Sequence, residues 1–271
     1  MKRLVNLTPS RPAALLFGLI PLLLVLGLYV SGSNARLAEN PNDKLLPSFA
    51  QMGAAIDRMA LQPSKRTGEY LFWKDTQSSL IRLGLGIGIA ALIGLVIGLL
   101  TGGLPVVNAS LSPLLTAISL VPPLALLPIL FIVFGLDELS KVVLIVVGVA
   151  PFIARDLQKH TMELPRELLV KAQTLGANSM QILVRVLLPQ IMPRLIDAVR
   201  LSLGTGWLFL IAAEAIASTD GLGYRIFLVR RYLAMDVIIP YVAWITLLAF
   251  LLDYVLARLS RALYPWHYKE G

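Results

Sequence analysis

The chain has 271 residues, of which 57% are hydrophobic and only 15% charged, with a formal net charge of +8 and no cysteine. A soluble domain usually carries about 25% charged residues, so this composition excludes an ordinary water-soluble globule and a disordered chain. The missing cysteine excludes disulfide scaffolds, thiol catalysis and iron–sulfur clusters. The basic excess predicts cationic cytoplasmic loops, whereas nucleic-acid binding would need a basic soluble face that the sequence does not offer.

The first apolar run covers residues 13–35, which contain no charged side chain. About 20 apolar residues suffice to cross the hydrocarbon of a bilayer. Lys2, Arg3 and Arg11 precede the run, as they would in a signal peptide. The run is longer than the usual apolar region of a signal peptide and lacks an Ala-x-Ala exit, so we predict a retained anchor helix.

Five further spans are predicted along the chain. The uncharged run from Leu83 to Leu136 is too long for one span and breaks at the Gly-Gly-Leu-Pro sequence of residues 102–105, which gives spans at 80–101 and 113–134. Shorter or later apolar stretches give spans at 139–153, 198–217 and 237–257. The expected fold is therefore an all-α membrane protein with about six transmembrane helices. A stripe of small residues for close helix packing in lipid is expected at Gly84, Gly88, Gly94, Gly98 and Gly102.

Lysine and arginine placement favours a cytoplasmic N-terminus, because basic residues gather at 1–12, in the loop 154–197 and after residue 257. The resulting organisation is an N-terminal segment with the first span (1–44), an outer loop (45–79), a core (80–260) and a cytoplasmic tail (261–271). Within the outer loop, four apolar residues at helical spacing predict a short interfacial helix: Phe49, Met52, Ile56 and Met59.

Several polar or helix-breaking residues fall inside the predicted spans. Glu214 is interpreted as a gate or a structural residue near the outer mouth, held in the latter case by a helix N-terminus or by the hydroxyls of Ser218 and Thr219. Pro122 and Pro123 remove two backbone donors, which predicts either a plain kink or an irregular segment that lines a pore. The charged residues at span ends are expected to reach the interface or to pair locally: Arg82, Lys141 and Arg200 by snorkelling, and Asp253 with Arg258.

No enzyme site is recognisable in the sequence. The two histidines, His160 and His267, are far apart and outside any metal-ligand spacing. No phosphate-binding Gly-Lys-Ser/Thr loop and no nucleophile elbow occurs. We therefore expect a transport subunit that holds no metal, cofactor or nucleotide of its own.

The loop 154–197 has the most informative pattern. Pro165 suits the first turn of a helix over 165–175, and Gly176 suits the left-handed residue that ends it. A second amphipathic stretch with Ile182 and Val186 follows, and Pro189 is expected to stop it. Two short helices joined by a glycine elbow would form a docking element for a soluble partner.

The spacing in this loop resembles the cytoplasmic coupling loop of permease subunits of bacterial ATP-binding-cassette (ABC) importers, Glu-Ala-Ala, three residues, Gly, nine residues, Ile-x-Leu-Pro. Val170 and Lys171 stand where the pattern has Glu and Ala, and Glu167 lies one turn earlier as a substitute for the acidic contact. The ATPase-coupling residues implied by the resemblance are Arg166, Glu167, Val170, Lys171, Ala172, Leu175, Gly176, Ala177, Val186, Leu188 and Pro189.

Other stretches resemble the nitrate, sulfonate and taurine branch of these permeases: Leu-Leu-Pro-Ser at 45–48, the Pro-Pro stretch at 121–128, Phe-Gly-Leu-Asp-Glu-Leu-Ser-Lys at 134–141, Ala-Ala-Glu at 212–214 with Gly-Leu-Gly at 221–223, and Tyr-Pro-Trp-His at 264–267. The resemblance implies a type I importer permease in a bacterial inner membrane that carries a small oxyanion. Implied partners are a second permease copy, two ATP-binding-cassette subunits that supply ATP and magnesium, a periplasmic binding protein and membrane lipid. An ion-coupled secondary transporter remains the alternative, although it would need a coupling site and usually repeated halves.

Overall fold

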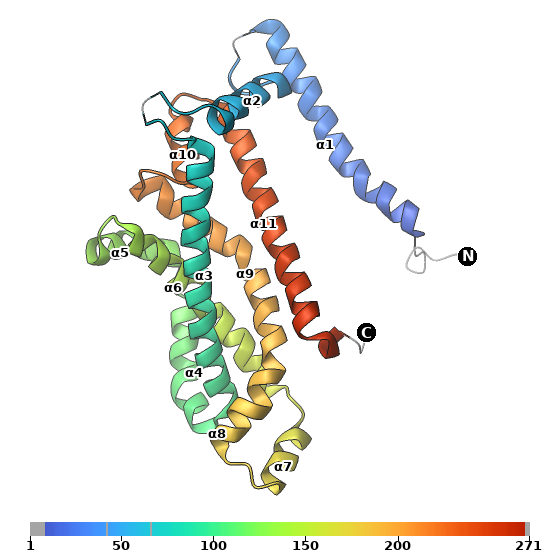
Figure 1. The fold of residues 1–271 in the computed structure, drawn as a ribbon, viewed down its shortest axis with the longest axis vertical. Coiled ribbons are helices and arrows are strands. Elements are labelled where there is room, and N and C mark those ends of the chain that lie inside the picture. Colours follow the sequence, from blue (N-terminus) through green and yellow to red (C-terminus); the bar gives the residue numbers. More distant parts are fainter. Residues whose placement is uncertain (1–8, 42, 66, 269–271) are drawn as a thin grey trace.

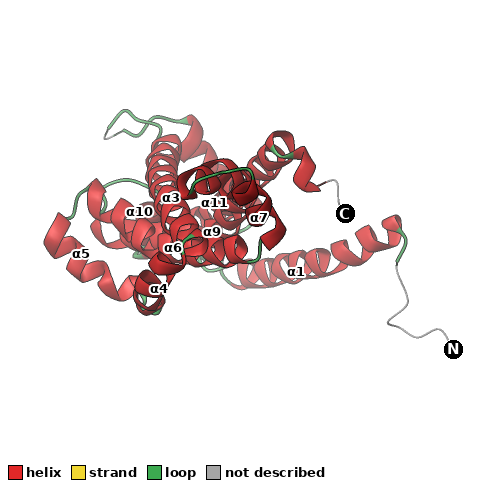
Figure 2. Cartoon of the chain, turned by 90° about the horizontal axis from the view of Figure 1, so that it is seen from below, coloured by secondary structure: helices red, strands yellow, loops and turns green. Residues whose placement is uncertain are grey.

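The computed structural model describes residues 9–41, 43–65 and 67–268, and helices joined by short turns make up this part of the chain, with no strand in it (Figures 1 and 2). The long helices are α1 (Arg11–Glu39), α3 (Leu71–Gly103), α6 (Glu138–Met162), α9 (Leu188–Ala217) and α11 (Met235–Leu263). The shorter α-helices are α2 (Phe49–Ile56), α4 (Pro105–Ser119), α5 (Leu127–Phe134), α7 (Arg166–Thr174), α8 (Ser179–Gln181) and α10 (Leu222–Arg230). Single-turn elements are η2 (Asp57–Leu61), η3 (Pro123–Leu126), η4 (Ile182–Leu187) and η5 (Pro265–Tyr268).

The core is built on the contact between α3 and α6, the most extensive between any two elements, with α9 packed against both. Small residues of α3 recur every fourth position on the contact face: Gly86, Ala90, Gly94, Gly98 and Gly102. A Cβ on Gly98 would lie 2.7 Å from Cβ of Leu157 and 2.8 Å from the carbonyl oxygen of Ala154. Helices approach this closely only where side chains are small.

The small-residue stripe predicted from the sequence is thus correct for its last three glycines and wrong for the first two. Gly84 and Gly88 have open space where a Cβ would be, and Gly86 lies on the contact instead. The reason is register: a four-residue period counted back from Gly94 reaches position 86, whereas 84 and 88 belong to another face of the helix. The sequence shows that glycines are frequent in this helix, but it does not show which face of the helix contacts α6.

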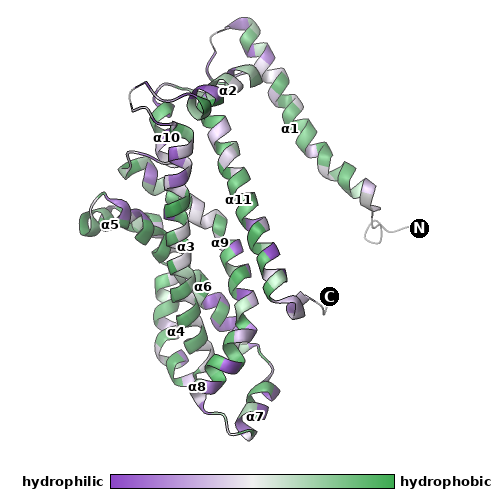
Figure 3. Cartoon of the chain, viewed as in Figure 1, coloured by the Kyte–Doolittle hydropathy of each residue, from purple (hydrophilic) through white to green (hydrophobic). Residues whose placement is uncertain are grey.

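Four helical stretches are long and apolar enough to cross a membrane within the described residues, or five if the bent pair α4–α5 counts as one span. The six predicted spans correspond to these five and to α6. Helix α6 has 25 residues, which at 1.5 Å per residue spans a bilayer core, but it carries charged residues at both ends. In Figure 3 the long helices are coloured mainly as hydrophobic, and hydrophilic residues are frequent near α10 and near α7 and α8, with further ones along α11.

Helix α1 stands apart from the other helices (Figure 1). None of its most apolar 18-residue window is buried. It is attached through the turn that follows it, where the Tyr29 hydroxyl donates to the Pro47 carbonyl at 2.7 Å and the Ser33 hydroxyl to the Leu46 carbonyl at 2.9 Å. Membrane lipid or another protein chain must therefore cover the apolar surface of α1.

The short helix predicted in the outer loop is present as α2, continued by the π-turn η2. Ser48 and Gln51 form a reciprocal capping box at its start, with the Gln51 N–H donating to the Ser48 hydroxyl oxygen. Met52 is buried, while Phe49 and Ile56 are exposed, and α2 packs beside α11. Only part of the predicted apolar stripe therefore faces the protein.

Pro189 does not stop a helix, contrary to the prediction. Residues Ser179–Ala217 form one long stretch in which α8, η4 and α9 continue into one another. The π-helical turn η4 lies directly before Pro189, and its wider winding leaves room for the pyrrolidine ring and a missing N–H. Because α6 also runs to Met162, the segment between the long helices is shorter than the predicted 154–197 loop.

Candidate functional site

Helix α7 hangs at one end of the molecule, joined to α6 and α8 by short turns (Figure 1). None of its residues is buried. Val170 is 55% exposed, and Leu175, just past the helix end, is 87% exposed. Within the described residues, Arg166, Glu167 and Lys171 form no ion pair. A helix that exposes apolar and unpaired charged side chains together has the character of a docking element.

Gly176 ends α7 as the sequence predicts. Its φ is +81°, in the left-handed region that favours glycine. The Gly176 N–H donates to the Gln173 carbonyl at 2.9 Å, and the Ala177 N–H to the Ala172 carbonyl at 3.0 Å. These bonds satisfy carbonyls that the helix end leaves free and fix the chain direction toward α8. Val186, Leu188 and Pro189, the distal half of the coupling pattern, lie in η4 and the first turn of α9, and η4 packs against α7.

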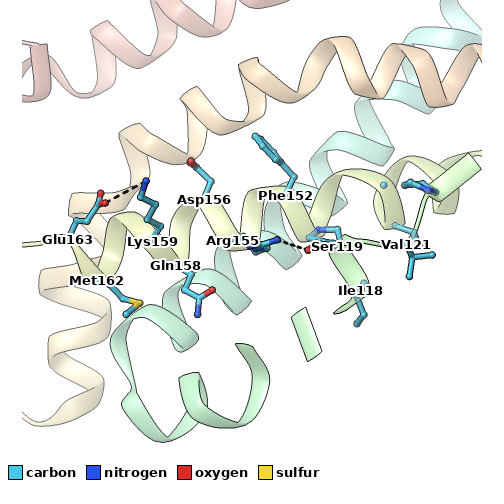
Figure 4. Close-up of a pocket in the computed structure, with 14 residues that line it drawn as sticks. Ile118, Ser119, Val121, Phe152, Arg155, Asp156, Gln158, Lys159, Met162 and Glu163 are labelled. Atoms are coloured by element: carbon cyan, nitrogen blue, oxygen red, sulfur yellow. Dashed lines mark hydrogen bonds and ion pairs between the residues drawn. The ribbon is translucent and has the colours of Figure 1, made fainter. Parts of the chain in front are cut away.

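The double proline marks a sharp bend rather than a straight third span. Helix α4 ends at Ser119, residues 120–122 are non-helical, and the segment Pro123–Phe134 leaves at 81° to α4. A cavity of about 730 Å³ lies between the bend, α4 and α6, and Pro123 and Val121 line it (Figure 4). Pro122 is exposed beside it. The break that the two prolines predict in the span 113–134 is therefore present, because proline supplies no N–H to continue the helix. It is an irregular segment beside a cavity, and the lining of a pore stays a prediction.

Glu214 lies fully buried in α9 near the α10 end of the molecule. Its carboxylate accepts hydrogen bonds from the Ser79 hydroxyl at 2.8 and 3.0 Å, from Arg82 Nη1 at 2.8 Å and from the Gly223 N–H at 2.8 Å. The predicted hydroxyl partner is wrong, because Ser79 of α3 takes that place, and the buried Ser218 hydroxyl has no hydrogen-bond partner within the described residues. The helix N-terminus that was the other expected partner is that of α10.

Arg82 is the centre of this cluster, which we call the Arg82 cluster: Ser79, Arg82, Glu138, Glu214 and Asp220. Arg82 is 4% exposed. Its guanidinium pairs with both oxygens of Glu138, with Glu214 at 2.8 Å and with the Asp220 carboxylate at 2.5 Å. The expected snorkelling of Arg82 is wrong, because three carboxylates from α6, α9 and the turn before α10 surround it. Paired charges of this kind tolerate burial that a single charge would not.

Lys141 belongs to the same region and is also buried. It is 3% exposed, and its ammonium lies 2.8 Å from Glu138 Oε1. It therefore faces the protein rather than the membrane interface, contrary to the expectation. Arg82 of α3 binds the same carboxylate, so Glu138 connects α6 to α3.

A second buried ion pair holds the start of α10. Asp75 is fully buried and accepts from Arg225 Nε at 2.7 Å, from the Gly221 N–H at 3.0 Å and from the Tyr241 hydroxyl at 3.3 Å. The next amide, of Leu222, donates to the Ser79 hydroxyl oxygen at 2.8 Å. Side chains of α3 and α9 thus accept from three consecutive N–H groups at the N-terminus of α10, which carries partial positive charge.

Asp253 pairs differently from the prediction. Arg200 of α9 donates to its two carboxylate oxygens at 2.9 and 3.2 Å. Arg258 instead lies over the ring of Tyr254 and donates to its hydroxyl. The pair therefore connects α9 to α11 and is not an intrahelical contact.

Three regions thus carry the residues singled out from the sequence, and the fold keeps them apart: α7 at one end, the Arg82 cluster near α10 at the other, and the proline bend between (Figure 1). Sequence reasoning assigned no role to Asp75, Ser79 or Asp220. A carboxylate that is buried needs hydrogen-bond donors. The position of Asp75 near the start of an apolar run was therefore the one sequence signal that could have pointed to these residues. Its partners lie more than a hundred residues away along the chain, and no local pattern reveals them.

Comparisons with known proteins decide the family. Residues 90–266 match the family described as binding-protein-dependent transport system inner membrane component. The chain belongs to this family. It is a permease subunit of an ABC importer, a multi-pass membrane protein, and the secondary transporter that the sequence left as an alternative is set aside.

Among similar curated proteins, the taurine transport system permease protein TauC of Escherichia coli K12 is 37% identical over 195 residues, which cover 72% of this chain and 71% of TauC. The putative aliphatic sulfonates transport permease protein SsuC of Bacillus subtilis is 31% identical over 70% of this chain and 69% of its own. The bicarbonate transport system permease protein CmpB of Synechococcus elongatus is 31% identical, with the same coverages.

Among solved structures, a chain of the MetNI methionine ABC transporter, in an inward-facing conformation, matches with a TM-score of 0.64 at 24% identity and covers 73% of this chain and 98% of that one. This likeness confirms the fold of an ABC importer permease.

Proposed function

We propose that this permease forms the translocation path for a small oxyanion, a sulfonate such as taurine in the first place, and that ATP hydrolysis in partner subunits drives the transport. The support for the substrate class is that the chain is similar to permeases named for taurine, aliphatic sulfonates and bicarbonate. The permease itself supplies the path and the coupling. ATP and magnesium belong to the partners.

The observation that carries the coupling role is the exposure of α7. It buries none of its residues, ends at a fixed glycine turn and leads directly into the long stretch 179–217. A displacement of α7 is therefore transmitted through the fixed turn at Gly176 and the contact of α7 with η4 to the continuous helix of residues 179–217. We propose that α7 seats in a cleft of an ATP-binding-cassette subunit, with Arg166, Glu167, Val170 and Lys171 at the contact.

The proposed assembly contains two copies of this permease, two ATPase subunits and a periplasmic binding protein. The α7 end then faces the cytoplasm and the α10 end faces the periplasm, with the N-terminus inside. Nitrate remains within the proposed substrate class, because a planar oxyanion presents the same charge and acceptor oxygens as a sulfonate. ATP binding shifts the permease pair between inward-facing and outward-facing states by its different affinity for the two.

The decisive experiment is purification of the tagged chain in mild detergent with mass spectrometry of what accompanies it. A stoichiometric ATPase subunit is the expected result. Uptake of radiolabelled taurine by cells that express the complete importer then tests the substrate, with loss of uptake in a strain that lacks the ATPase. A chain that purifies alone and moves solute into liposomes without ATP would contradict the proposal.

A further inference from the structure

The cavity at the proline bend has a size and composition that suit a small solute. Its volume of about 730 Å³ falls within the range of roughly 300–1,000 Å³ typical of ligand pockets. One wall is the second half of α6, and the other is the end of α4 with the non-helical residues that follow (Figure 4). Irregular backbone at membrane depth persists where it lines protein or water, so a hydrated cavity at this bend is physically consistent.

Four ionisable side chains line the cavity, and three of them are already paired. Lys159 lies 3.8 Å from Glu163. Asp156 accepts two hydrogen bonds at 3.0 Å from Arg194, which lies outside the lining. Arg155 has no carboxylate partner within the described residues. Arg155 is therefore the one cation of this lining that no carboxylate contacts directly within the described residues.

The Arg155 guanidinium is held in place by a neutral partner. Its Nη1 donates to the Ser119 hydroxyl at 2.8 Å, and Figure 4 shows the side chain directed across the cavity toward Ser119. Ser119 is the last residue of α4, so the bend itself sets the position of this contact. The hydroxyl in turn donates to the Thr116 carbonyl at 2.8 Å, which fixes its lone pairs toward the arginine. Four further N–H groups of the guanidinium remain available to a ligand.

We propose that Arg155 is the anion-selecting residue of the translocation path and binds the oxyanion as it passes the α4–α6 cavity. This inference rests on the proposed function for the identity of the cargo. Arginine presents N–H donors in a planar fork that matches the oxygens of a sulfonate or carboxylate. Because a single hydrogen bond to a neutral hydroxyl holds Arg155, an anion is bound without competition from a protein carboxylate and is released again.

A thiol-labelling experiment tests the charge in the cavity without knowledge of the cargo. The chain has no cysteine, so Phe152→Cys places a single thiol in the lining, one helical turn from Arg155. The purified complex with its ATPase subunits in nanodiscs is treated with a sulfonate-bearing or a trimethylammonium-bearing methanethiosulfonate reagent. The increase in the intact mass of the chain with time gives the labelling rate for each reagent. Each labelling rate is divided by the rate of the same reagent with a small free thiol in solution.

The expected result is that the anionic reagent is favoured, and that Arg155→Gln lowers the ratio of the two rates by about tenfold, because a charge in a cleft concentrates counter-ions. Arg155→Lys keeps most of the preference. Arg185→Gln is the matched control, because Arg185 is a cation outside the cavity lining, and it leaves the ratio within about twofold. An unchanged ratio in Arg155→Gln overturns the inference.

Taurine uptake then tests the role in transport. Arg155→Gln is expected to lower uptake by about tenfold or more, while co-purification of the ATPase subunit stays as in the unsubstituted chain. Arg155→Lys recovers part of the uptake. Normal uptake in Arg155→Gln overturns the inference even if the labelling ratio falls. If the unsubstituted importer does not take up taurine, the proposed substrate is wrong, and the labelling ratio still decides whether the cavity selects anions.

Discussion

The two ends of this permease treat charge in opposite ways. At the α10 end, Asp75, Arg82 and Glu214 are almost completely buried, and each is bound by groups from other helices. At the α7 end, Arg166, Glu167 and Lys171 are exposed and unpaired within the described residues. The first arrangement connects five helices: α3, α6, α9, α10 and α11. The second leaves a short helix with its side chains exposed to solvent. The same residue types therefore hold helices together at one end and, in the proposed function, contact a partner subunit at the other.

The largest expected effect is that of Arg82→Ala. It leaves Glu214 buried without its cation, and breaking a buried ion pair costs about 3–5 kcal/mol. The free energy of unfolding in detergent, measured by chemical denaturation, should fall by that amount. Arg194→Ala, which removes a partly exposed arginine paired with Asp156, is the matched control with a smaller loss. An equal fall in the free energy of unfolding in the two variants would show that burial does not make the ion pairs at the α10 end more important for stability.

Two glycines compare the ends directly. Gly221 and Gly176 both have positive φ, +113° and +81°. A Cβ on Gly221 would lie 2.5 Å from the Glu214 carboxyl carbon, whereas nothing lies within 4 Å of one on Gly176. Gly221→Ala should therefore lower the free energy of unfolding by about 2–4 kcal/mol, and Gly176→Ala by about 1 kcal/mol. Thermal melting of the two variants beside the unsubstituted chain measures the difference, and the reverse order would contradict the packing described for α10.

Gly176→Asp separates folding from coupling at the α7 end. Aspartate tolerates the left-handed conformation better than most residues, so the loss of stability should stay near 1 kcal/mol. The added charge on the exposed elbow should weaken ATPase docking and lower uptake by about tenfold. Co-purification and uptake are measured on the same preparation. Normal transport with an intact complex would show that α7 is not the docking element.

The smallest effect concerns the two positions that depart from the coupling pattern. If Glu167 supplies the acidic contact that Val170 does not, Glu167→Gln should lower ATP-driven uptake by about threefold to tenfold. Adding Val170→Glu to that variant should restore much of it, because the two positions lie almost one turn apart on an exposed helix. Val170→Glu alone serves as the control and should change uptake little. Failure of the rescue would assign the contact to other residues.

Local patterns in the sequence predict well where helices occur. They predict less well whether two consecutive helices continue into one another or meet at a bend. The start and end of α7, the break at residues 102–105 and the helix at 49–56 follow from caps, glycine and proline, which act within a few residues. Pro189 and the pair Pro122–Pro123 show the limit of this reasoning. One proline is absorbed by a π-turn and the pair produces a bend of 81°, and the neighbouring elements decide between these outcomes.

The sequence by itself determined that this is an apolar, all-helical membrane protein with a short helix that starts near Pro165 and ends at Gly176, because composition, hydropathy and capping depend on residues close together in the chain. Only the tertiary structure decided which charges pair. Arg82 with Glu214, Asp75 with Arg225 and Arg200 with Asp253 join residues 53 to 150 positions apart. It also decided which glycines of α3 meet α6, since this depends on how the helices pack. For the same reason only the structure shows that, of the cations lining the α4–α6 cavity, Arg155 has no carboxylate partner within the described residues.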